Sequence, residues 1–203
     1  MIRGLILAAA ALVLAQPAAA ANLTVSGGKL VGATNLLIDG KAYNLELVEG
    51  TCAQVYGSCD SNAGFTFKTR ETALLAGRAI VSQVLLDTAQ GNFKSDYTKT
   101  FGCAANNTFF TGGACYIYLP YSVNASNIPV VGVFNSDVAG GNESASAGNA
   151  ATPSFDTANQ DWVVWARFEA VPEPSSWALL IAGFAAIGGA ARRRRPAVRA
   201  AVR

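Results

Sequence analysis

In the middle of the chain, hydrophobic and polar residues alternate on both sides of the dipeptide Asp39-Gly40. This dipeptide favours a two-residue type I′ turn, whose twist suits two antiparallel strands. The pattern over 35–49 therefore predicts a β-hairpin in which Tyr43, Leu45 and Leu47 share the buried face. Three further segments rich in β-branched and aromatic residues are predicted strands, and they span 116–121, 129–134 and 161–169.

A different spacing follows between these strands, where residues 70–87 repeat their hydrophobic positions at nearly helical intervals. Thr69 suits the N-cap, Glu71 suits the positive end of the helix dipole, and Gly91 would end the helix. An antiparallel sheet with a hairpin and one long covering helix is an α+β domain, which is the expected fold class. Residues 137–161 have too few apolar side chains to offset the cost of ordering them, and we expect a mobile loop there.

The first segment of the chain has the three parts of a secretory signal peptide. Arg3 precedes an uninterrupted apolar run over 5–14, and a helix-breaking proline then leads into a run of alanines. A short buried helix is the alternative, but no polar residues line one face of this stretch. Small residues allow signal peptidase to cut after Ala20 or Ala21, so residues 1–21 are the expected signal peptide.

A second apolar segment lies near the other end, where the 15 residues from Trp177 to Ala191 carry no charge. As a helix they would be about 22 Å long, and extending the segment to 175–191 reaches the lower limit for crossing a bilayer. The positive-inside rule would place the basic tail over 192–203 in the cytoplasm. The arginines that fix this topology are Arg192, Arg193, Arg194 and Arg195. The fold class therefore includes a C-terminal transmembrane sorting helix.

The tetrapeptide Val171, Pro172, Glu173, Pro174 stands between the expected domain over 22–170 and this helix. Each proline fixes its own φ and moves the preceding residue out of the helical region, giving an extended backbone that a protease or transpeptidase groove accepts. The chain has, in this order, the segment Val-Pro-Glu-Pro-Ser, a short apolar helix with glycines, and an arginine cluster. This order resembles the PEP-CTERM sorting signal of Gram-negative bacteria. The sorting signal would then span residues 171–203.

This resemblance implies that an exosortase, a membrane-embedded cysteine transpeptidase, removes the helix after a transient insertion in the inner membrane. The protein would then pass to the cell surface or an exopolysaccharide matrix. A single-span tail anchor is the alternative. The stretch GTCAQVYGSCDSNAGFTF through GNFKSDYT, then CYIYLPYSVN, also resembles a recurrent PEP-CTERM passenger domain without an assigned activity.

Charge narrows the possible partners of the exported domain. Residues 22–174 contain eight Lys and Arg against 13 Asp and Glu, a net charge of −5, because the other basic residues lie at the two ends. An acidic domain is repelled by phosphate backbones and by anionic lipid head groups. We therefore expect binding neither to nucleic acid nor to a membrane surface, and no cofactor is indicated.

Four cysteines in an exported domain indicate two disulfides. Of the three possible pairings the local one, Cys52–Cys59 with Cys103–Cys115, is favoured because each pair brackets a glycine-containing loop. A zinc site is the alternative, but the spacing does not suit paired knuckles and the chain has no histidine. Without histidine the usual triads are excluded, and no motif places a glycosidase carboxylate pair, so we expect no enzymatic activity.

Aromatic residues provide a candidate ligand site. Strand alternation puts Tyr116 and Tyr118 on one face, and Trp165 shares its side with Arg167 and Glu169. Flat rings beside polar groups can stack on sugars, although aromatic residues in strands more often pack in the core. The expected function is a structural or adhesive protein in an exopolysaccharide or biofilm context, and a polysaccharide-binding module is the alternative.

Overall fold

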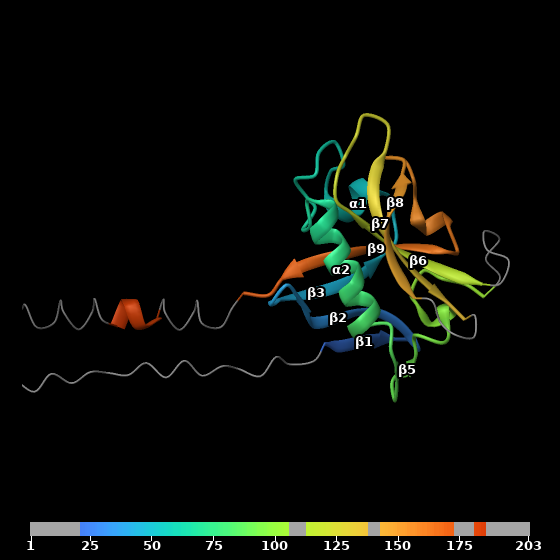
Figure 1. Cartoon of the computed structure of the whole chain (residues 1–203), viewed down its shortest axis with the longest axis horizontal. Helices are drawn as coiled ribbons and strands as arrows, with labels where there is room; N and C mark the ends of the chain where they lie inside the picture. Colours follow the sequence, from blue (N-terminus) through green and yellow to red (C-terminus); the bar gives the residue numbers. More distant parts are fainter. Residues whose placement is uncertain (1–20, 106–112, 138–142, 173–180, 186–203) are drawn as a thin grey trace, which may run out of the picture.

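A seven-stranded sheet forms the centre of the protein, described here from a computed structural model (Figure 1). The structure describes residues 21–105, 113–137, 143–172 and 181–185. The order across the sheet is β1-β2-β3-β9-β6-β7-β8. Its strands are β1 (Asn22–Ser26), β2 (Lys29–Ile38), β3 (Lys41–Val48), β6 (Ala114–Pro120), β7 (Ile128–Ser136), β8 (Ser144–Ala151) and β9 (Val163–Ala170). Strands β6 and β9 run parallel, and the other neighbouring strands run antiparallel.

Smaller elements complete the described fold. Strands β4 (Asp87–Thr88) and β5 (Gly91–Asn92) form a separate two-stranded hairpin. The helical elements are α1 (Cys52–Tyr56), α2 (Arg70–Gln83), η1 (Tyr97–Lys99) and η2 (Thr157–Asn159).

The predicted hairpin is confirmed. β2 and β3 are joined by Asp39 and Gly40, both at positive φ (50° and 74°), as a type I′ turn requires. Leu45 and Leu47 are buried in the core beneath α2, and Tyr43 packs against the same core.

Helix α2 lies across one face of the sheet (Figure 1). Thr69 caps its N-terminus by accepting a hydrogen bond from the Thr72 N–H, as predicted, and the helix ends at Gln83, earlier than expected. The Gln83 side chain donates to the Leu37 carbonyl at 2.9 Å and accepts from the Leu37 N–H at 3.1 Å. These two bonds hold the C-terminal end of α2 on β2.

The predicted fold class is wrong, because the described domain is mostly β-sheet rather than α+β with one long covering helix. The 14-residue helix α2 is about 21 Å long and about 10 Å wide, whereas seven strands about 4.8 Å apart make a wider sheet than it can cover. The described residues also contain no helix long and apolar enough to cross a membrane. Of the predicted transmembrane segment, the structure describes a short helical stretch over 181–185, and the remainder lies outside the described residues.

Part of this error came from the mobile loop predicted over 137–161, which is wrong for residues 143–161, while residues 138–142 lie outside the described residues. Residues 144–151 form β8, which pairs with β7 along its length. The small side chains of β8 are needed here because α2 crosses close above it: a Cβ at Gly77 would lie 2.9 Å from the Ala145 Cβ. β8 is therefore ordered by the β7 ladder and by close packing rather than by large apolar residues of its own. Strand β1, which pairs with β2, was not predicted either.

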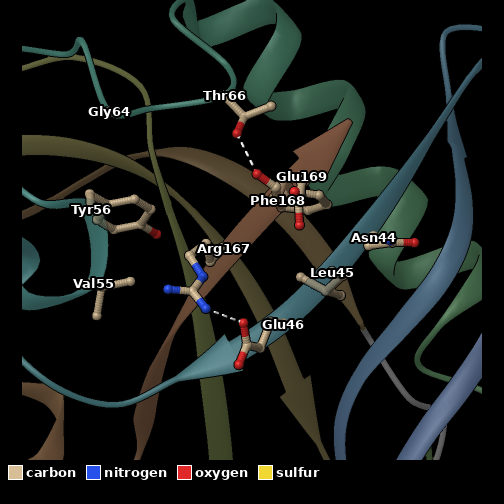
Figure 2. Close-up of a pocket in the computed structure, with 10 residues that line it drawn as sticks. All are labelled: Asn44, Leu45, Glu46, Val55, Tyr56, Gly64, Thr66, Arg167, Phe168 and Glu169. Carbon is tan, nitrogen blue, oxygen red and sulfur yellow. Dashed lines mark hydrogen bonds and ion pairs between the residues drawn. The ribbon is translucent and has the colours of Figure 1, made fainter. Parts of the chain in front are cut away.

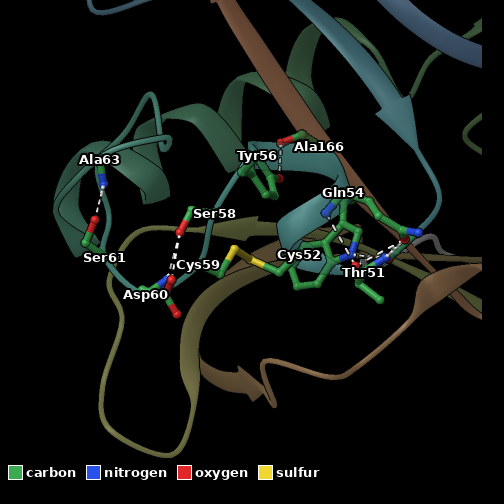
Figure 3. Close-up of a disulfide and its surroundings, with 12 residues drawn as sticks. Thr51, Cys52, Gln54, Tyr56, Ser58, Cys59, Asp60, Ser61, Ala63 and Ala166 are labelled. Atoms are coloured by element: carbon green, nitrogen blue, oxygen red, sulfur yellow. Dashed lines mark hydrogen bonds between the residues drawn. A yellow bond between two sulfur atoms is a disulfide. The ribbon is translucent and has the colours of Figure 1, made fainter.

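The opposite face of the sheet is covered by α1 and the segment that follows it (Figure 3). Thr51 and Gln54 form a capping box, in which the Gln54 side chain accepts from the Thr51 N–H at 2.7 Å. Cys52 opens the helix and is joined to Cys59, two residues beyond the C-cap Gly57. The disulfide therefore ties the two ends of this short covering element together.

The second disulfide joins Cys103 to Cys115, near the start of β6. Both cysteines are buried with Tyr97, whose hydroxyl donates to the Ala105 carbonyl at 2.9 Å. Both pairings are those favoured from the spacing of the cysteines.

Candidate functional site

A polar pocket of about 360 Å³ opens between β3, β9, the end of α1 and the segment that follows α1 (Figure 2). Its polar lining comes from three parts of the chain that are distant in sequence. These polar residues are Asn44, Glu46, Tyr56, Thr66, Arg167 and Glu169.

The pairing of β3 with β9 sets the floor of the pocket. Asn44 lies opposite Glu169, and Glu46 lies opposite Arg167, in antiparallel register. Because side chains alternate along a strand, all four project on the face away from α2. Arg167 Nη2 binds Glu46 Oε2, and their side chains are 48% and 58% exposed. An exposed pair of this kind contributes at most about 1 kcal/mol to stability, so it can exchange for a ligand at little cost.

Two hydroxyl groups form the wall of the pocket. The Tyr56 hydroxyl donates to the Ala166 carbonyl at 2.8 Å, and the Thr66 hydroxyl donates to the Phe168 carbonyl at 2.7 Å. Both carbonyls belong to the part of β9 beyond Trp165, where its pairing with β6 ends. Burial raises the pKa of the Tyr56 phenol, with the Arg167 charge opposing in part, so the phenol stays a neutral donor.

The chemistry that this pocket offers is hydrogen bonding to a polar ligand. Carboxylates accept, the guanidinium donates through several N–H groups, and the Asn44 amide does both. Such a mixture suits the hydroxyl groups of a sugar. Among the described ranges, no group of three or more Cys, Asp or Glu side chains is placed to hold a metal ion.

The predicted ligand residues Tyr116, Tyr118 and Trp165 lie together on the same face of the sheet, beside the pocket. Trp165 is fully buried, and its indole N–H donates to the Gly50 carbonyl at 2.9 Å. Tyr118 is 7% exposed, and its ring centroid lies 5.9 Å from that of Trp165. Tyr116 is partly exposed, and its ring centroid lies 5.3 Å from that of Phe134. The rings of Trp165 and Tyr118 are thus core packing in this conformation and offer a ligand little surface.

The sequence therefore indicated one side of the pocket and missed the other. Arg167 and Glu169 do share a face with Trp165, as predicted, and they open on the pocket. The same alternation that puts Tyr43, Leu45 and Leu47 on the buried face of the hairpin puts Asn44 and Glu46 on its other, polar face, which was a usable signal. Tyr56 and Thr66 carried no such signal, because only the tertiary fold brings them to β9.

A second candidate site begins where β9 ends. Ala170 pairs with Tyr43, the Val171 N–H donates to the Ala42 carbonyl at 2.9 Å, and Pro172 follows directly. Residues 170–195 match the family described as the PEP-CTERM protein-sorting motif. The chain carries a PEP-CTERM sorting motif. Neither the curated proteins nor the solved structures contain a match to this chain.

The PEP-CTERM motif implies an exported protein that is anchored transiently in the membrane and then processed by an exosortase. The activity of the passenger domain is not assigned by the motif. Glu173, Pro174 and the four arginines of the expected topology signal lie outside the described residues, as do residues 1–20 of the expected signal peptide over 1–21.

Proposed function

We propose that this protein is a structural or adhesive component of the cell surface or extracellular matrix of a Gram-negative bacterium, in an exopolysaccharide or biofilm context. One observation carries the proposal: strand β9 of a domain with two disulfides runs directly into a PEP-CTERM motif. Signal peptidase would remove the first segment and exosortase the last. The chain without histidine carries no motif for catalysis, which supports a non-enzymatic role.

The proposal is tested by the mass and the location of the protein in its native host. We expect the mature protein in the matrix fraction, with an intact mass that lacks the signal peptide and the segment after Pro172-Glu173-Pro174. A host without the gene should form a matrix with less retained biomass, and complementation should restore it. A mature protein that stays in the inner membrane with its arginines attached would contradict the proposal.

A polysaccharide-binding module is the second candidate, favoured by the open row of Asn44, Glu46, Arg167 and Glu169. Affinity electrophoresis of the mature protein on purified host exopolysaccharide would test it. We expect Arg167→Ala to weaken retention about tenfold or more, since it removes a charged hydrogen-bond donor. Arg78→Ala is the matched control, at an exposed arginine of α2 on the opposite side of the sheet. Equal retention of both variants would exclude the pocket.

A further inference from the structure

The PEP-CTERM motif and the folded sheet share residues. The matched segment begins at Ala170, which is the last residue of β9 and pairs with Tyr43. Val171 is bound to Ala42 by a backbone hydrogen bond of 2.9 Å. The start of the sorting motif is therefore part of the β3–β9 ladder, and no linker residue separates that ladder from Pro172.

This overlap creates a competition for backbone groups. An enzyme that binds its substrate as an extended strand uses the N–H and C=O groups of the substrate backbone. Glu169 already pairs with Asn44 of β3 through the groups that face that strand, and the Val171 N–H is already bonded to the Ala42 carbonyl. One set of backbone groups cannot serve the sheet and an enzyme groove at the same time.

The end of β9 is built so that it can separate without disturbing the core. β6 pairs with β9 only as far as Trp165, so beyond that point β3 is the neighbouring strand that holds β9. Phe168 is the last buried residue of β9, and its ring centroid lies 5.0 Å from that of Phe67. The Thr66 hydroxyl donates a hydrogen bond to the Phe168 carbonyl. Glu169 and Ala170 are exposed and Val171 is partly buried. Phe168 thus anchors the strand, while the next three residues can detach at small cost.

We propose that residues 169–171 are part of the segment that exosortase binds, and that they leave β3 when the enzyme engages. The end of the sheet formed by Ala42, Tyr43 and Val171 is then the surface of the domain that meets the enzyme. The proposal rests on the processing that the proposed function assumes, and it adds the part of the fold that must open.

A disulfide across the ladder tests this proposal in the full chain. Tyr43 and Ala170 form a non-hydrogen-bonded pair, because the adjacent pair Ala42 and Val171 carries the hydrogen bond. Cα atoms in such a pair are about 4.5 Å apart, within the range that a disulfide spans. The Tyr43→Cys/Ala170→Cys variant would form its bridge outside the cytoplasm and hold residues 169–171 on β3. The matched control is Tyr43→Ser/Ala170→Ser, which loses the same side chains without the bridge.

The readout is the rate at which the sorting segment is lost, followed by pulse-chase and intact mass in the native host. We expect the bridged variant to be processed at least about tenfold more slowly than the serine control, because cleavage of a segment that must open depends on its open population. Inserting Gly-Ser-Gly-Ser between Val171 and Pro172 of the bridged variant should restore the rate, since it supplies free backbone.

Two outcomes would overturn the proposal. If the bridged variant is processed as fast as the serine control, the enzyme reads only residues after Val171. If the insertion fails to restore the rate, the bridge acts elsewhere. A wild-type chain that is never shortened would instead contradict the proposed function itself, and the inference would fall with it.

Discussion

The two faces of the sheet are closed by different physical means. On one face α2 packs on aliphatic residues and approaches the strands closely at Gly77, opposite Ala145 and Val131. On the other face a five-residue helix, α1, covers a cluster rich in aromatic rings, and the Cys52–Cys59 disulfide holds it. A helix as short as α1 is not stable alone, whereas α2 is long enough to present a packing surface. The stability of the α2 face should therefore be sensitive to added side-chain volume. The stability of the α1 face should be sensitive to the loss of a disulfide or a hydrogen bond.

The largest expected effect is on the α2 face. In Gly77→Val the new Cβ would meet Ala145 Cβ at 2.9 Å and Val131 Cγ1 at 3.0 Å. Overpacking of this kind should lower the free energy of unfolding by about 3 kcal/mol. Arg78→Val is the matched control, because it places the same β-branched side chain at an exposed helix position and should cost about 0.5 kcal/mol or less. Urea denaturation of both variants would show whether helix and sheet approach as closely as described.

Removing the disulfide of the α1 face should have the next largest effect. For Cys52→Ala/Cys59→Ala the chain-entropy model gives a loss of about 2.5 kcal/mol in the free energy of unfolding. Tryptophan fluorescence should change as well, since Trp165 lies beneath α1. Ser58→Ala/Ser61→Ala, at the two serines on either side of Cys59, should change stability by about 0.5 kcal/mol or less. Equal stability of the two double variants would mean that packing alone holds α1.

The same contrast explains which parts of the fold the sequence could predict. Turn residues predict the β2–β3 hairpin, a capping residue predicts the start of α2, and the positions of the cysteines predict the local disulfides. The strands β6, β7 and β9 are predicted by their β-branched and aromatic residues. Strand β8 does not, because its Ser, Ala and Gly residues resemble a loop until α2 and β7 are placed against them. The missing strands, and the shortness of α2, made the α+β prediction wrong.

The candidate pocket was predictable only on its strand side. Arg167 and Glu169 are placed by alternation along β9, and Glu46 by alternation along β3. That these two strands are neighbours is a long-range pairing which no local pattern indicates. The Tyr56 and Thr66 hydroxyls donate to carbonyls on the edge of β9 that no described strand pairs with beyond Trp165. This edge exists only in the folded sheet, so the sequence gives no local signal for it.

A smaller effect is expected for Trp165→Phe on the α1 face. The variant loses the hydrogen bond from the indole N–H to the Gly50 carbonyl and leaves a small cavity at a fully buried position. The two losses together should lower the free energy of unfolding by about 2 kcal/mol. Trp162→Phe, at a partly exposed position, should cost less than half as much. Similar losses in both variants would mean that burial of Trp165 contributes little to this face.

The smallest expected effect at neutral pH is that of Tyr118→Phe, which keeps the ring in the aromatic cluster and should change stability by about 0.5 kcal/mol or less.

Burial raises the pKa of Tyr118 to about 12 from its ordinary value of 10.0. Below pH 10 the phenol is neutral in both the folded and the unfolded chain, so its ionisation leaves stability unchanged. Between about pH 10 and 12 the unfolded chain loses this proton and the folded chain keeps it, so wild-type stability falls as pH rises. Urea midpoints measured from pH 8 to 12 should therefore fall less steeply for Tyr118→Phe than for the wild type. Parallel curves for the two proteins would mean that the Tyr118 hydroxyl is hydrated, and that the aromatic face is more open than the aliphatic one.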